Sequence, residues 1–179
     1  MRLRRACKEG DVMEIKRLLQ AGASVFSYDE AFERTALHYA AQNGHADCCA
    51  ILVQCGAQVA SIDLSGHQAL HIAAENGNVA VCNWLCTRGG ADLCARTPNG
   101  SVALHYAANN NHHEVASVLV DLMKEAGHLR VHKWGARSAY EAFRNNYGQT
   151  PPELARERGH LRLAEMLEKA VELRAHLQG

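Results

Sequence analysis

The chain has 179 residues, in which 19 basic side chains balance 19 acidic ones and the sequence pI is about 7.2. Such a chain has no overall field to attract nucleic acid or an anionic membrane, so we expect neither as a partner. No apolar stretch reaches the length of about 18 residues that a membrane-spanning helix needs.

The cysteines indicate a reducing compartment. There are seven, an odd number. Four of them stand where the repeat described below requires an apolar side chain, at Cys48, Cys49, Cys82 and Cys86. We therefore expect small buried thiols and no disulfide framework. No apolar run follows the basic residues at the start, so no signal peptide is expected, and the predicted location is the cytoplasm or the nucleus.

The first predicted element, residues 1–24, is an incomplete repeat with two short helices. Only 6–11 and 15–23 keep the pattern that later segments show, with Gly10 between the two helices. Each end of a stack of repeats faces water on one side, so its terminal repeats are charged and atypical. We expect this segment to cap the stack.

Three central segments repeat one motif, Leu-His-x-Ala-Ala, and their histidines are 33 and 34 residues apart: His38, His71 and His105. In each, a turn precedes apolar residues at helical spacing, and a residue that tolerates positive φ ends the first helix. These terminators are Gly10, Gly44, Gly77, Asn111 and Gly159. We therefore predict turn-helix-helix repeats at about 25–58, 59–91 and 92–144.

The repeat at 92–144 is longer than the others. From His105 to the equivalent Glu153 there are 48 residues instead of 33 or 34, so about 15 residues are inserted. The other repeats have only a short turn after the second helix. We place the insertion at about 126–144.

The insertion combines basic and aromatic side chains. Capping-box spacing predicts a short helix over 139–144, with Tyr140 and Phe143 on one side. Trp134 and Arg137 precede this helix. One interpretation is a projecting loop that binds an acidic partner peptide, because Trp, Tyr and Arg dominate interface hot spots. The other is a loop whose aromatic side chains pack onto adjacent helices.

The last predicted repeat, 145–179, keeps Thr-Pro and Leu-Ala but has Glu153 where the others have histidine. Its second helix is expected to continue to about Leu177 with an apolar stripe. That stripe either caps the stack or docks a partner or a second copy.

Turn-helix-helix repeats of 33 residues with Leu-His-x-Ala resemble the ankyrin repeat family. The resemblance implies an all-α solenoid of about five repeats, forming a single domain over 1–179. It also implies that His38, His71 and His105 hydrogen-bond to loop backbone between neighbouring repeats.

Stacked repeats create a long groove and no enclosed pocket, which favours partner binding over catalysis. No phosphate-binding loop, nucleophile elbow or metal-ligand spacing is found, so we expect no enzyme activity, cofactor or metal. The expected function is a monomeric protein–protein interaction module: an adaptor, scaffold or inhibitor. Two alternatives stay open: a sensor of a nucleotide or another small anion at the insertion, and a regulatory amino-terminal part of a larger protein.

The resemblance places partner binding on the concave face, formed by the turns and the exposed ends of the first helices. The candidate residues are Tyr28, Phe32, Arg34, Gln42, Asn43, His67, Glu75, Asn76, Asn109, Asn110 and Tyr147, together with Trp134 and Arg137 from the insertion. The turn from Asp29 is one residue longer than the next and lacks its glycine. We expect Phe32 to project from it as an anchor for a protein or peptide.

Overall fold

The computed structural model describes residues 2–129 and 139–172. These residues form ten α-helices, and the extended pairing within them is a single isolated bridge between Tyr28 and Thr35. The all-α class expected from the sequence is therefore confirmed.

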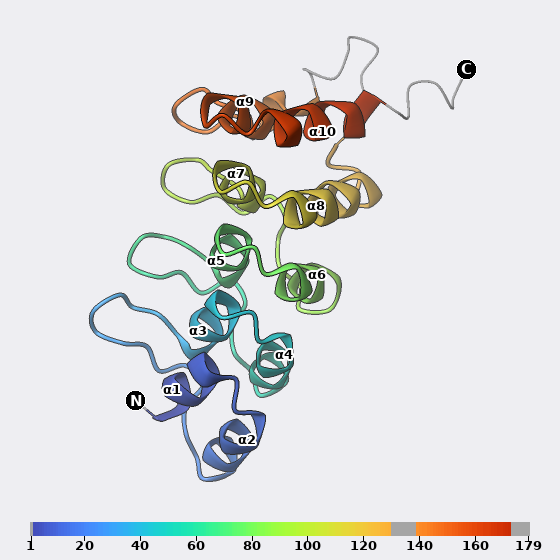
Figure 1. Cartoon of the computed structure of the whole chain (residues 1–179). Helices are drawn as coiled ribbons and strands as arrows, with labels where there is room; N and C mark the ends of the chain where they lie inside the picture. The colour runs from blue at the N-terminus through green and yellow to red at the C-terminus, as the bar shows by residue number, and fades with distance from the viewer. Residues whose placement is uncertain (1, 130–138, 173–179) are drawn as a thin grey trace. The chain divides into compact units, whose positions relative to one another are not determined.

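The helices come in pairs, each with a first and a second helix (Figure 1). The first helices are α1 (Arg2–Glu9), α3 (Ala36–Gln42), α5 (Ala69–Glu75), α7 (Ala103–Asn109) and α9 (Pro151–Glu157). The second helices are α2 (Val12–Gln20), α4 (Ala46–Gln54), α6 (Val79–Thr87), α8 (His113–Glu125) and α10 (Leu161–Glu172).

The pairs are grouped into two compact units. Unit 1, Met1–Asp92, holds α1 to α6, and unit 2, Leu93–Gly179, holds α7 to α10. In unit 1 each first helix packs on the next first helix, and each second helix on the next second helix. Unit 2 repeats this arrangement, with α7 on α9 and α8 on α10. Both units are thus stacks of helix pairs, the arrangement of a repeat solenoid.

The first helices begin with a hydrogen bond that the motif histidine provides. The backbone N–H of Thr35 donates to Nδ1 of His38 at 3.1 Å, and that of Val102 donates to Nδ1 of His105 at 3.2 Å. The first N–H groups of a helix have no partner within the helix, so these bonds satisfy a donor that would otherwise be unpaired.

The same histidines join neighbouring repeats. Nε2 of His38 lies 3.0 Å from the carbonyl oxygen of His67, and Nε2 of His105 lies 3.1 Å from that of Gln149. Both rings are buried. The role in linking repeats that the family resemblance implied is confirmed for these two residues.

The predicted terminators of the first helices all have positive φ, between 61° and 81°. Four of the five are glycines, and the fifth is Asn111 with φ 61°. Asparagine tolerates the left-handed region better than most residues that carry a β-carbon. The pattern that located the helix ends in the sequence is therefore confirmed.

The core is built from alanine, leucine and cysteine side chains between the helices. Cys48, Cys49 and Cys82 are buried as predicted, and Cys86 is half-buried. Every cysteine of the chain is free, and burial raises the pKa of the Cys49 thiol to about 12. These side chains therefore serve as small apolar groups.

Part of the extra length in the fourth helix pair is helical. α8 has 13 residues, whereas α4 and α6 have nine each, so α8 continues for about one further turn. In place of the short helix predicted over 139–144, the structure has a 3-10 helix at Glu141–Phe143. The helix ends at Arg144, whose ψ of 130° is outside the helical range. Trp134 and Arg137 lie outside the described residues.

The two aromatic residues of this segment pack inward. Tyr140 and Phe143 are both buried, and the hydroxyl of Tyr140 donates to the carbonyl oxygen of Leu167 in α10 at 3.0 Å. For these two residues the packing interpretation is correct. On α10 itself Leu163 and Val171 are buried, so its apolar stripe covers the neighbouring helices as far as residue 171.

Candidate partner-binding surface

Polar side chains shape the turns that precede the first helices. In unit 1, Oδ1 of Asp63 accepts hydrogen bonds from the backbone N–H groups of Ser65 and His67 at 3.0 and 2.9 Å. In unit 2, Oδ1 of Asn145 accepts from Tyr147 and Gln149, both at 3.0 Å. Each turn is therefore held in one conformation by its own side chain.

Asp63 also binds the guanidinium of Arg34, whose Nε lies 3.0 Å from Oδ2. Burial alone raises the pKa of the Asp63 carboxyl, but the N–H groups of His67 and Ser65 and the Arg34 guanidinium together hold it below its ordinary value. Arg34 further contacts the side-chain oxygen of Gln42 at 3.4 Å. Two predicted binding residues, Arg34 and Gln42, are thus engaged within the protein.

The two turns of unit 1 expose apolar side chains, Tyr28 at the base of the first turn and Phe32 and Leu64 at the tips. Tyr28, Phe32 and Leu64 are 59 %, 57 % and 65 % exposed, and we call these three residues the turn patch. The backbone N–H of Leu64 donates to the carbonyl oxygen of Phe32 at 2.9 Å, so the two tips lie side by side. Phe26 and Ile62, from the same two loops, are also exposed. The expected projection of Phe32 is confirmed.

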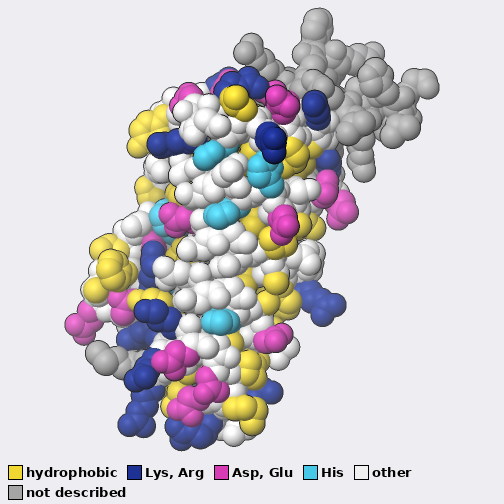
Figure 2. Space-filling model, viewed as in Figure 1, with side chains coloured by type: hydrophobic (Ala, Val, Ile, Leu, Met, Phe, Trp, Pro, Cys, Tyr) yellow, Lys and Arg dark blue, Asp and Glu magenta, His cyan; other side chains and the backbone are white. Residues whose placement is uncertain are grey.

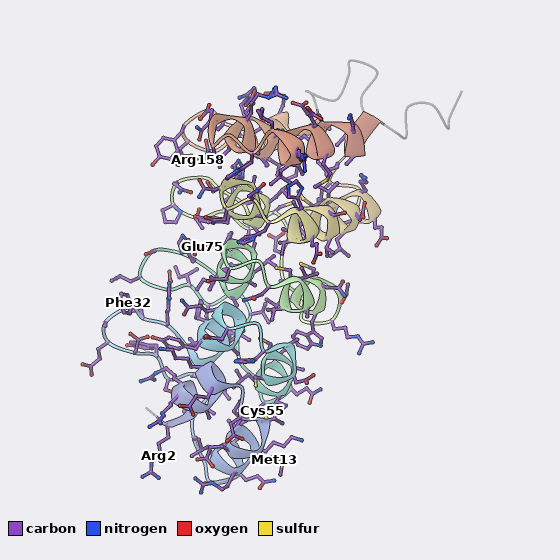
Figure 3. The ribbon with its side chains drawn as sticks, in the orientation of Figure 1. Arg2, Met13, Phe32, Cys55, Glu75 and Arg158 are labelled. Atoms are coloured by element: carbon purple, nitrogen blue, oxygen red, sulfur yellow. The ribbon has the colours of Figure 1, made fainter. Side chains whose placement is uncertain are left out.

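The figures show this arrangement. Figure 2 shows hydrophobic side chains gathered where the turns of unit 1 project, with acidic and basic side chains beside them. Figure 3 places Phe32 on the loop before α3. The guanidinium of Arg34 lies 5.7 Å from the centre of the Phe32 ring, within cation–π distance.

The asparagines at the ends of the first helices cap those helices. In Asn43, Asn76 and Asn110 the side-chain Nδ2 donates to the carbonyl oxygen four residues earlier, at 2.8, 2.8 and 3.1 Å. These three residues are exposed. The sequence predicted their position but missed the capping role, because asparagine suits a partner and a helix end equally well.

The remaining candidates in unit 1 are half-buried. Glu75 ends α5, as Figure 3 shows, and His67 lies in the turn before that helix. The His67 ring is 6.3 Å from that of His71, which is buried.

Unit 2 contributes a smaller set of candidates. The carbonyl oxygen of Asn109 accepts from Nε2 of His160 at 3.1 Å, which ties the end of α7 to the next helix pair. Tyr147 is 74 % exposed at the tip of the turn before α9. A backbone hydrogen bond of 2.9 Å from Asn146 to the carbonyl oxygen of Asn99 joins this tip to the preceding turn.

The sequence analysis missed three exposed apolar residues on the two loops of unit 1 that carry the turn patch. Phe26, Ile62 and Leu64 are exposed but are not among the candidates from the sequence. A large apolar residue inside a polar turn was the available signal. For the part of the chain that the structure describes, no group of three or more His, Cys, Asp or Glu side chains could hold a metal ion.

Each unit is a stack of helix pairs in which a motif histidine bonds to the next turn, and exposed side chains stand on the turns. These features define a helical repeat protein. A family model for ankyrin repeats, in three copies, matches residues 3–97, and the single ankyrin repeat model matches residues 99–128. The chain belongs to the ankyrin repeat family. A comparison with curated proteins finds no match.

Ankyrin repeats are generally protein–protein interaction modules and typically have no catalytic activity. Among the helices of the described residues, none is long and apolar enough to cross a membrane.

Proposed function

We propose that this chain is a non-enzymatic interaction module that binds a protein or a peptide through the turn patch of unit 1. The observation that carries the proposal is the exposure of five large apolar side chains on only two loops: Phe26, Tyr28, Phe32, Ile62 and Leu64. Clustered apolar side chains on a soluble protein mark interaction sites, and aromatic residues provide much of the binding energy.

The rigidity of the two turns supports this proposal. Asp29 and Asp63 accept backbone hydrogen bonds within their own turns, and a backbone hydrogen bond connects one tip to the other. A surface that is already ordered loses little conformational entropy when a partner binds. The turn patch therefore has both the apolar area and the preorganisation of a binding site.

The exposed helix ends extend the proposed surface. Asn43 and Asn76 use one amide N–H group of the side chain for capping, and an amide has further donor and acceptor capacity for a peptide backbone. In this proposal the protein acts as an adaptor, a scaffold or an inhibitor in the cytoplasm or the nucleus, and binds its partner as a monomer. Unit 2, taken by itself, offers a comparable set of groups at Asn109, Asn110 and Tyr147.

Capture from a cell lysate with matched variants tests the proposal. The full chain carrying Phe32→Ser and Leu64→Ser should capture specific partners at least about tenfold less than the unmodified chain. Met13→Ser is the control, because Met13 is 75 % exposed but lies on α2, away from Phe32 (Figure 3). Thermal unfolding of each variant establishes that the fold is retained.

The two variants separate the turn patch from general surface hydrophobicity. Loss of capture with the double variant and normal capture with Met13→Ser would support the site. Equal capture by all three proteins would show that the turn patch is not the binding surface.

A further inference from the structure

The turn before α3 has a glutamate where the other turns of this kind have glycine. Glu33 has φ 54°, and the residues at the corresponding places, Gly66, Gly100 and Gly148, have φ 76°, 77° and 76°. The left-handed region costs free energy for any residue with a β-carbon, and glutamate lacks the short side chain that helps asparagine there. The first turn thus keeps a glutamate at a position where the backbone favours glycine.

Glu33 is not needed to shape its turn. The carboxylate of Asp29 accepts the backbone N–H groups of Phe32 at 2.7 Å and Arg34 at 3.1 Å. The Tyr39 hydroxyl also donates to this carboxylate, at 3.1 Å. Only the backbone of Glu33 takes part, through its N–H, which donates to the Asp29 carbonyl oxygen.

The side chains of Glu30 and Glu33 are exposed beside the turn patch. Within residues 2–129 and 139–172, neither carboxylate has an ion-pair partner. The nearest guanidinium in sequence, that of Arg34, is bound to Asp63 and is only 20 % exposed. The loop therefore offers two available negative charges next to exposed aromatic rings, while its positive charge is already neutralised.

We propose that the turn patch binds an extended segment of a partner protein in which a large apolar side chain neighbours a lysine or an arginine. This inference rests on the proposed function and specifies the partner's chemistry. The apolar side chain packs between Phe32 and Leu64, and the cation pairs with Glu33 or Glu30. Opposite charge beside an apolar anchor fixes the register of the segment and rejects acidic competitors.

Selection from random peptides provides a direct test. A library of random 12-residue peptides displayed on phage is selected against the immobilised full chain, and the enriched peptides are measured by fluorescence anisotropy. We expect enrichment of aromatic or aliphatic residues next to lysine or arginine. We also expect binding to weaken with rising salt, because exposed charge pairs are screened.

Variants separate the charges from the apolar contact. Glu30→Gln with Glu33→Gln should weaken binding of the selected peptides by about tenfold, the effect expected from losing two exposed charge pairs. Glu114→Gln, on the exposed side of α8, removes a charge far along the chain and should leave binding unchanged.

Several results would overturn the inference. They are enrichment of acidic or uncharged peptides, no enrichment at all, or elution of the chain as a dimer that Phe32→Ser dissociates. Binding that survives Glu30→Gln with Glu33→Gln but is lost with Phe32→Ser and Leu64→Ser would reject the basic partner and keep the proposed function. Binding that survives both pairs of substitutions would reject both.

Discussion

His105 connects α7 to the turn before α9 through both nitrogens of its ring. A backbone N–H can only donate, so the bond from Val102 requires Nδ1 to be unprotonated. Nε2 therefore carries the hydrogen and donates to the carbonyl oxygen of Gln149. The ring is 1 % exposed, and burial lowers the pKa of His105 from its ordinary 6.5 to about 4. The folded protein thus holds this ring neutral.

This shift makes the fold sensitive to mild acid. Below pH 6.5 the unfolded chain takes up a proton at this position and the folded chain does not, so the free energy of unfolding falls as the pH falls. With the pKa values of 6.5 and about 4, the loss between pH 7 and pH 5 is about 2 kcal/mol. Burial also lowers the pKa of His38, which adds to the loss in the same direction.

Urea unfolding at pH 7, 6 and 5, followed by circular dichroism, measures this loss. His105→Gln should be less stable at pH 7, because a flexible glutamine amide does not reproduce the fixed spacing of the two ring nitrogens. It should also lose about 2 kcal/mol less than the unmodified protein between pH 7 and pH 5. His113→Gln, at an exposed position of α8, is the control and should behave like the unmodified protein. Equal losses for His105→Gln and the unmodified protein would refute the argument.

Three further predictions concern separate parts of the fold. Asn78→Ala removes an amide that donates to two carbonyl oxygens at the end of α3, so it should lower the free energy of unfolding by about 1–3 kcal/mol, measured by urea unfolding. Asn83→Ala, at an exposed position, should lower it by less than about 0.5 kcal/mol. Gly100→Ala brings a methyl group within 2.5 Å of a side-chain oxygen in the next turn, so it should lower the melting temperature more than Gly148→Ala, which has similar φ and nothing within 4 Å. Glu33→Gly relieves a left-handed glutamate and should raise the free energy of unfolding by about 1 kcal/mol, measured by urea unfolding. Equal effects within the asparagine or glycine pair, or a loss of stability at position 33, would contradict the corresponding prediction.

The helix pairs could be predicted from the sequence because each one repeats the same backbone requirements. A first helix must stop in the left-handed region, so glycine or asparagine returns at that place, and Asn111 is identified even though it breaks the glycine pattern. The buried histidines return for the same reason, since His38 and His105 make equivalent bonds to the next turn. One glycine or histidine alone predicts little, but its return at the same place in each repeat reliably locates the helices.

The partners of individual polar side chains could not be predicted in the same way. Arg34 is a candidate binding residue in the sequence, and its ion pair with Asp63, 29 residues later in the chain, was not predicted. The helix-capping hydrogen bonds of Asn43 and Asn76, two further candidate binding residues, were not predicted either. Such choices depend on side-chain conformation and on contacts between repeats, which spacing in the sequence does not encode.

The last helix pair shows how a departure from the motif is compensated within the fold. Glu153 stands where the other repeats have histidine, and its carboxylate accepts the backbone N–H of Thr150 at 2.9 Å, as a motif histidine does. A carboxylate has no equivalent of the Nε2–H that the motif histidines donate. Instead it binds the guanidinium of Arg144 at 2.8 Å, and Arg144 also pairs with Glu141 at 2.6 Å. The replacement therefore has a structural explanation.

Departures that the fold does not explain are the best indicators of function in a repeat protein. Asn111 departs from the glycine pattern but tolerates the required φ, and Glu153 departs from the histidine pattern but is paired with Arg144. Glu33 departs from the glycine pattern at a cost in stability, and within the described residues its side chain has no ion pair to offset that cost. The fold accounts for Asn111 and Glu153 but not for Glu33. Binding of a partner best accounts for Glu33, because a cationic group of the partner beside Phe32 would pair with its carboxylate.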